Sequence, residues 1–375
     1  MSPRNKQAGN AQGAADPGEG AGRRTMDNAG LVALAEGHWF DACEAMLRQR
    51  ILAGDDAPPV KLAHELASIG HRVISLDAED FLELATQVKH RPWASRLSQC
   101  CFPIEPRARE RGALGSLVPL YELMLEVIQL RAQRHEPQAL VVTAHLIAEY
   151  LCQLAWEERL GHGGDPLRLP KDVGERWGTD DPECPHSSVM RATAKRAVNA
   201  GKGDLKGFTS YLDRFHSRLG DTLAVCAMNH QTIDAGERPD VGPTCPNPCR
   251  WAVAGPVDER RALDARLRLG LIYLESPLVA LRHHAPVGHF FGVPSIAEIS
   301  DGWLKTWEKL TTQWPDGSNP LVAAVDQGSY PIQKDEALPG LSMLVSVVAG
   351  RPVQPGTLLH DIADDIVRTL GWVRD

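Results

Sequence analysis

Apolar residues recur at helical spacing along most of the chain, and this pattern predicts a mainly α-helical protein. In the stretch AGLVALAEGHWFDACEAMLRQRIL, Leu31, Trp39 and Met46 fall on one predicted helical face, and the piece AEGHWFDACEAML favours a helical hairpin. The same spacing predicts helices at about 58–73, 77–88, 113–133, 137–160, 188–200, 204–231, 258–281, 295–314 and 355–373.

Some of these segments carry signals for their place in the fold. Residues 137–160 are apolar on most sides, so we expect this helix at the centre of a core. Ser295 and Glu298 have the spacing of a capping box, which predicts a helix start. The segment LSMLVSVVAG (341–350) lies between Pro and Gly turns and is compatible with one strand or another buried element.

Composition divides the chain into four parts. Residues 1–26 are poor in bulky apolar groups and predict a disordered tail. A helical domain is expected over 27–160, and the Gly-, Pro- and Asp-rich stretch 161–187 predicts a linker. Residues 188–375 form a second helical domain that contains a Cys/His loop (226–251) and a mixed C-terminal segment. The expected fold is therefore two helical lobes joined by a Gly/Pro-rich linker.

Net charge and hydropathy restrict the classes of partner and the cellular compartment that are expected for this chain. The formal net charge of -8 argues against broad attraction to nucleic acid or to an anionic membrane, although a local basic patch is compatible with it. No segment approaches the roughly 20 uninterrupted apolar residues of a spanning helix, and the N-terminus lacks the apolar core of a signal peptide. The eight cysteines are expected to be reduced, so the sequence predicts a cytoplasmic protein.

Two closely spaced ligand pairs predict a zinc site. Cys226 and His230 lie one helical turn apart, and Cys245 and Cys249 are separated by a proline-rich turn. Zinc takes four such ligands in a tetrahedron, and four protein ligands leave no open position for water. The sequence therefore predicts a structural zinc that closes the loop 226–251.

Other interpretations of these cysteines stay open. Cys184 and His186 form a nearby pair that is able to replace one of the predicted pairs. The three residues between Cys245 and Cys249 differ from the two-residue spacing common in zinc fingers. Without a metal, the helix-terminal Cys226 would pack as a small apolar side chain and the other two cysteines would belong to a loop.

A second candidate site is the segment LRHHAPVGHFFGVPS. Arg282, His284 and His289 combine a guanidinium, which holds phosphate or a developing anion, with imidazoles that titrate near neutral pH. The Arg-x6-His arrangement resembles the paired Arg and His of HEPN-type ribonucleases, in which the RNA 2′-hydroxyl attacks its own phosphate without a metal. Alternatively, the segment is a loop between two helices, anchored in the core by Phe290 and Phe291.

Two further groupings favour structural roles. Trp303 and Trp307 are four residues apart and share a helical face, which is typical of a core or a subunit interface. His360, Asp361, Asp364 and Asp365 superficially suggest a phosphohydrolase metal site, but the apolar stripe on the same helix predicts that the acidic residues are solvated.

The sequence favours a non-enzymatic function. No phosphate-binding loop, dinucleotide fingerprint, nucleophile elbow or zinc-protease helix occurs in it. The first hypothesis is a cytoplasmic helical adaptor or scaffold of a multiprotein assembly, with a protein partner and a structural zinc. One alternative is a metal-independent ribonuclease or other phosphodiester-cleaving enzyme of a host-defence or toxin system, and another is a DNA-binding regulator.

Overall fold

A computed structural model describes residues 28–102, 116–160, 256–284, 292–330, 332 and 335–371 of the chain. All regular elements in these ranges are helices, and no strand occurs among them. The prediction of a mainly α-helical fold is therefore confirmed. The chain divides into two compact units, one comprising Met1–Arg72 with His360–Asp375 and the other Val73–Leu359.

Three parts of the predicted domain organisation lie outside the described residues. These are the tail 1–26, the linker 161–187 and the Cys/His loop 226–251. The predicted arrangement of two lobes about that linker therefore stays a prediction. The two compact units are described separately below.

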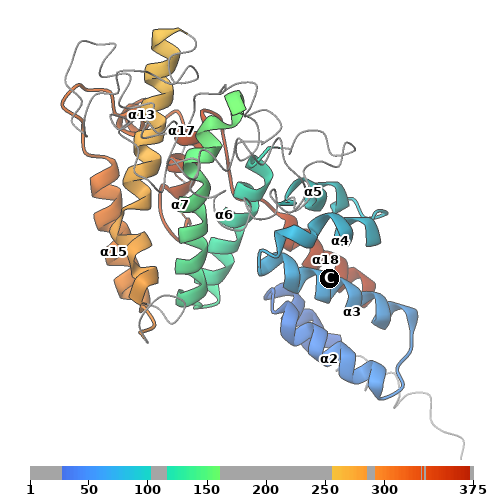
Figure 1. Cartoon of the computed structure of the whole chain (residues 1–375). Helices are drawn as coiled ribbons and strands as arrows, with labels where there is room; N and C mark the ends of the chain where they lie inside the picture. Colours follow the sequence, from blue (N-terminus) through green and yellow to red (C-terminus); the bar gives the residue numbers. More distant parts are fainter. Residues whose placement is uncertain are drawn as a thin grey trace, which may run out of the picture. The chain divides into compact units, whose positions relative to one another are not determined.

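The first unit brings together segments from the two ends of the described chain (Figure 1). It contains a helix over residues 28–36, α2 (Phe40–Leu52), most of α3 (Pro58–Ile74) and most of α18 (Leu358–Thr369). The Asn28 side chain donates a hydrogen bond to the backbone carbonyl of Leu370 at 3.1 Å. Its small core contains the fully buried side chains of Leu31, Phe40, Leu47, Leu66, Ile362 and Ile366.

A turn after the first helix changes which residues of α2 are buried. The sequence pattern placed Trp39 and Met46 on the same face as Leu31, and this interpretation is wrong, because Trp39 and Met46 are exposed. The chain turns at His38, whose φ is +57°, and α2 begins with a new helical phase. Phe40 becomes part of the buried face instead.

The second unit consists of the helices between the two segments of the first. In chain order these are η1 (Ala78–Asp80), α4 (Phe81–Gln87), α5 (Ala94–Gln99), α6 (Val118–Gln133), α7 (Pro137–Leu160), α13 (Val257–Leu274), α14 (Pro277–Ala280), η3 (Leu281–His284), α15 (Ile296–Leu310), α16 (Pro320–Gln327) and α17 (Leu341–Ala349). As expected from its composition, α7 is central, and it packs against α6, α13, α14, α15, α17 and η3 (Figure 1).

Two buried tyrosines connect α6 and α13 to α7 through hydrogen bonds. The Tyr121 hydroxyl of α6 donates to the Ile147 carbonyl at 2.8 Å, and the Tyr273 hydroxyl of α13 donates to the Ala144 carbonyl at 3.2 Å. Burial raises the pKa of both phenols above its ordinary value, so both stay protonated donors. Each buried hydroxyl therefore has a hydrogen-bond partner on the central helix.

The C-terminal part of the second unit is helical in every described element. The capping box at Ser295 and Glu298 opens α15 as predicted. The segment 341–350 was compatible with a strand or another buried element, and the structure shows the buried element, which is the helix α17 followed by its C-cap Gly350. All but the last residue of α17 are buried, including Ser342 and Ser346, so its sequence lacks the charged face that marks a surface helix.

One described helix is long and apolar enough to cross a membrane. Residues Pro137–Glu158 of α7 have a mean hydropathy of 1.4, and 67% of this stretch is buried within the protein. Burial of that extent is typical of the core helix of a soluble protein, which agrees with the contacts of α7 described above.

Candidate functional site

The predicted zinc ligands Cys226, His230, Cys245 and Cys249 lie outside the described residues. The possible substitute ligands Cys184 and His186 also lie outside them. In the described ranges, no group of three or more His, Cys, Asp or Glu side chains is placed to hold a metal ion. The zinc site therefore stays a prediction.

Two cysteines in the described ranges have the features of an unreactive thiol. None of Cys43, Cys100, Cys101 and Cys152 forms a disulfide, and three of them are buried. Burial raises the pKa of the Cys43 and Cys100 thiols to about 12. Because the thiolate is the reactive form, both side chains act as small apolar groups at neutral pH.

Arg282 is the predicted catalytic residue whose side chain the structure describes. It lies in η3, and its Nη1 is 3.9 Å from Oε1 of Glu149 on α7. The same Oε1 is 3.1 Å from Nε2 of His145, one helical turn earlier. The side chain of His284 and the whole of His289 lie outside the described residues. The structure therefore places Arg282 near Glu149, which also contacts His145, and the sequence reasoning missed both residues.

The arginines of α13 make contacts within the second unit. The Arg268 guanidinium lies 4.2 Å from the centroid of the Trp314 ring, a cation–π arrangement. The Arg266 side chain covers Gly350, at the C-terminal end of α17, where the helix dipole favours a cation. These two side chains therefore contribute to packing within the second unit.

An exposed apolar surface lies on α2 in the first unit. Trp39, the N-cap of α2, is 37% exposed, and Met46, about two turns further along the helix, is 43% exposed. Gly37 makes room for the Trp39 indole, because a Cβ at Gly37 would lie 2.7 Å from the Trp39 ring. We call Trp39, Ala42 and Met46 the α2 surface.

Edge-on contacts between aromatic rings hold the turn that carries the α2 surface. The His38 ring meets the Phe40 ring edge-on, with centroids 5.8 Å apart. It also meets the His360 ring at 4.5 Å. His38 is 7% exposed, so the residue next to Trp39 is anchored in the unit. The Trp39 side chain is thus presented from a fixed backbone.

The first unit is acidic. Its described residues contain nine Asp and Glu but only five Lys and Arg. Asp41 is exposed in the first turn of α2, two residues from Trp39. Arg48 is paired with Glu44, and Arg50 is paired with Asp55, so these two arginines do not offset the remaining carboxylates. The α2 surface therefore combines exposed apolar groups with a negative surrounding.

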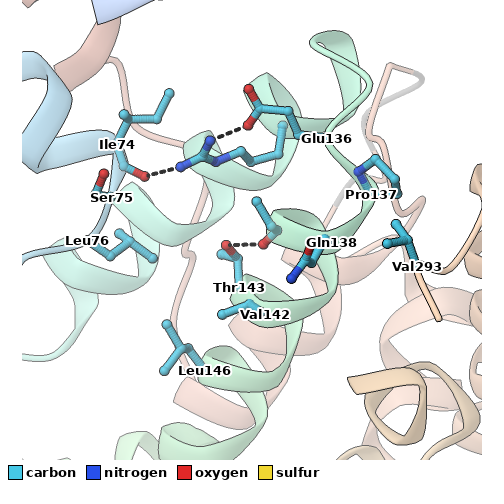
Figure 2. A pocket seen from close by; sticks show the side chains of 12 residues that line it. Ile74, Ser75, Leu76, Glu136, Pro137, Gln138, Val142, Thr143, Leu146 and Val293 are labelled. Atoms are coloured by element: carbon cyan, nitrogen blue, oxygen red, sulfur yellow. Dashed lines mark hydrogen bonds and ion pairs between the residues drawn. The ribbon is translucent and has the colours of Figure 1, made fainter. Parts of the chain in front are cut away.

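A cleft of about 540 Å³ opens in the second unit beside the first turns of α7 (Figure 2). One wall comes from the end of α3 and the following turn, with Ile74, Ser75 and Leu76. The opposite wall contains α7 residues such as Val142 and Leu146, and the segment before α15 adds another side chain. We call this the α7 cleft.

The charged groups of the α7 cleft are paired with one another. The Arg131 guanidinium forms an ion pair with Glu136 and donates to the Ile74 carbonyl at 3.0 Å (Figure 2). The Thr143 hydroxyl donates to the Ala139 carbonyl at 3.0 Å. The terminal nitrogens of Arg131 and the Thr143 hydroxyl therefore have partners within the protein, and the Arg131 Nε is buried away from solvent. Aliphatic groups dominate what the cleft offers to a ligand.

Comparison of the chain with protein-family models, with curated proteins and with solved structures finds no match. Inferences about function therefore rest on the α2 surface, the α7 cleft and the contacts of Arg282.

Proposed function

We propose that this protein is a cytoplasmic helical adaptor that binds a partner protein through the α2 surface. The observation that carries the proposal is the exposure of Trp39 and Met46 on a fixed helix of an acidic unit. Tryptophan and methionine are enriched in the centres of protein interfaces. Charged residues around such a centre steer a partner of opposite charge.

The chemistry of the α2 surface determines which side chains a partner needs. An apolar side chain of the partner would pack against Trp39 and Met46, and Lys or Arg nearby would face Asp41 and the other carboxylates. An amphipathic helix with one apolar and one basic side meets both requirements. A structural zinc at Cys226, His230, Cys245 and Cys249 is part of this proposal as a stabiliser and not as a catalyst.

The test compares two substitutions on α2. Met46→Asp places a charge on the α2 surface, whereas Leu52→Asp places the same charge at a residue that is 75% exposed on another side of the helix. Quantitative mass spectrometry identifies the proteins that bind the wild type and Leu52→Asp but do not bind Met46→Asp. The affinity of the purified partner is then measured by calorimetry.

We expect Met46→Asp to lower the affinity for the partner by at least about tenfold, as for a residue at the centre of an interface. Leu52→Asp should bind as the wild type does, and affinity should fall as salt rises. Equal binding by Met46→Asp, or binding that increases with salt, would contradict the proposal.

A second candidate function is metal-independent cleavage of RNA around Arg282. It is favoured by the position of Arg282 beside Glu149 and His145, which gives a cation and an imidazole within one cluster. In this reaction the 2′-oxygen bonds to the neighbouring phosphorus and the bond to the 5′-oxygen breaks. One group takes the 2′ proton, and another protonates the leaving oxygen.

Purified protein incubated with mixed RNA and a chelator between pH 6 and 9 tests the second candidate. Cleavage that is lost in Arg282→Ala and His289→Ala, but kept in Leu52→Asp, would support it. Intact RNA across this pH range would reject it. Full partner binding by Arg282→Ala would show that the adaptor function is independent of this cluster.

A further inference from the structure

The dimensions of the α7 cleft fit a small molecule. Ligand sites in proteins are commonly clefts of roughly 300–1,000 Å³ that are mainly apolar with a few polar groups. The α7 cleft has a volume of about 540 Å³ and is lined by Leu76, Val142, Leu146 and Val293, among others. These side chains come from segments that are far apart in the sequence, so the cleft is a product of the folded unit.

The charge pattern of the cleft restricts the class of ligand. Arg131 has Glu136 as its counter-ion and the Ile74 carbonyl as a second acceptor. A charged ligand would have to displace one of these partners or lie against apolar walls without a counter-ion, and both are unfavourable. An uncharged ligand can occupy the cleft without displacing a partner of Arg131 and without needing a counter-ion.

Two neutral polar groups remain at the edges of the cleft. Gln138, at the start of α7, carries an amide, and Ser75, on the opposite wall, carries a hydroxyl (Figure 2). Each can donate and accept hydrogen bonds without a change in charge. They suit a ligand with a single neutral oxygen, such as an alcohol or a ketone.

We propose that the α7 cleft binds a small, uncharged, mainly aliphatic molecule that carries a neutral oxygen. This site is separate from the α2 surface and does not depend on the adaptor function. Ligand binding would stabilise the folded second unit by an amount that rises with the logarithm of the ligand concentration once this exceeds the dissociation constant.

Fluorescence titration of the full chain with N-phenyl-1-naphthylamine, an uncharged apolar probe, tests the proposal. We expect a saturable signal that 1-decanol reverses at a concentration at least about tenfold lower than decanoate does. The two competitors have the same chain length, so the comparison isolates the effect of the ligand's charge. Equal competition by decanoate, or no saturable binding, would overturn the proposal.

Three variants locate the bound probe. Ala139→Phe fills the cleft, and Val293→Asp places a charge at a wall residue that is 56% exposed and therefore tolerant of substitution. Ala57→Phe is the control, because Ala57 is exposed in the first unit. We expect the two cleft variants to bind the probe at least about tenfold more weakly than the control.

The folded state of each variant is checked by circular dichroism and thermal melting. If Ala139→Phe does not fold, Val293→Asp decides the question, because its side chain contributes little buried area. Probe binding by Val293→Asp that equals binding by Ala57→Phe would place the probe elsewhere and overturn the proposal.

Discussion

Glu126, in α6, accepts a hydrogen bond from the backbone N–H of Leu358, the first residue of α18, at 2.9 Å. Its other carboxylate oxygen accepts from the N–H of Leu359, also at 2.9 Å. The first N–H groups of an α-helix have no acceptor within the helix, and the helix dipole favours a negative charge there. A side chain 232 residues earlier thus provides the N-terminal cap of α18.

Substitution of Glu126 should reduce stability. Glu126 is 2% exposed, so Glu126→Ala leaves two buried donors without an acceptor, and we expect a loss of about 2–4 kcal/mol. Glu126→Gln keeps one acceptor and should lose about 1–2 kcal/mol. Urea unfolding followed by tryptophan fluorescence measures both. Glu158→Gln, at an exposed position, is the control. Equal losses for all three variants would argue against a capping role.

Gly340 is expected to be intolerant of a side chain. Its φ is +93°, and a Cβ there would overlap the Trp307 indole. Gly340→Ala should therefore cost roughly 2–4 kcal/mol, from the left-handed backbone and from overpacking together. In a Trp307→Phe background the overlap is relieved, and only the backbone cost of about 1–2 kcal/mol should remain. A double-mutant cycle measures this coupling. Full additivity would show that the indole does not restrict Gly340.

Glu336 should make stability depend on pH. It is 8% exposed, and burial raises the pKa of its carboxyl above the ordinary 4.5, although its hydrogen bond from the Gly340 N–H acts in the opposite direction. The folded state then holds the proton more tightly than the unfolded state. The free energy of unfolding therefore falls as pH rises above about 4.5 and levels off above the folded pKa.

Glu336→Gln removes this titration and keeps an acceptor oxygen. The stability of the wild type relative to the variant should decrease between pH 4.5 and pH 7.5 in urea unfolding experiments. An increase over the same interval would show that the carboxylate is stabilised by its hydrogen bonds more than it is penalised by burial.

The zinc prediction is tested by the metal content of protein purified without chelator. Elemental mass spectrometry should find about one zinc per chain in the wild type. The double variant Cys245→Ser/Cys249→Ser should lose the metal and part of its stability. Cys101→Ser, outside the predicted ligand set, should keep both. A wild type without zinc would remove the structural zinc from the proposed function.

Local sequence signals predicted much of the fold. The capping box at Ser295 and the apolar stripe of α18 each depend on residues within one or two turns, and both are present in the structure. Trp303 is buried and its ring centroid is 5.8 Å from that of Trp307, in agreement with their predicted common face. Such local patterns are sufficient to predict the buried face of a helix that packs with one face against one core.

Features that depend on distant segments were missed. Asp365 was expected to be solvated, yet it is 4% exposed. The phase of α2 changed because His38 adopts a left-handed conformation and interrupts the apolar pattern. Histidine is enriched in that conformation but adopts it uncommonly, so its presence alone does not predict the turn. The α7 cleft combines the end of α3, the start of α7 and the segment before α15, so spacing along the sequence does not reveal it.

The first unit has a consequence for the order of folding during synthesis. Its core joins residues near position 31 to residues near position 366, and the whole second unit is encoded between them. A ribosome therefore releases α2 and α3 long before the segment that completes their core is made. Until then Leu31 and Phe40 lack part of their packing, so the nascent chain has to delay closure of this unit or shield it until translation is nearly finished.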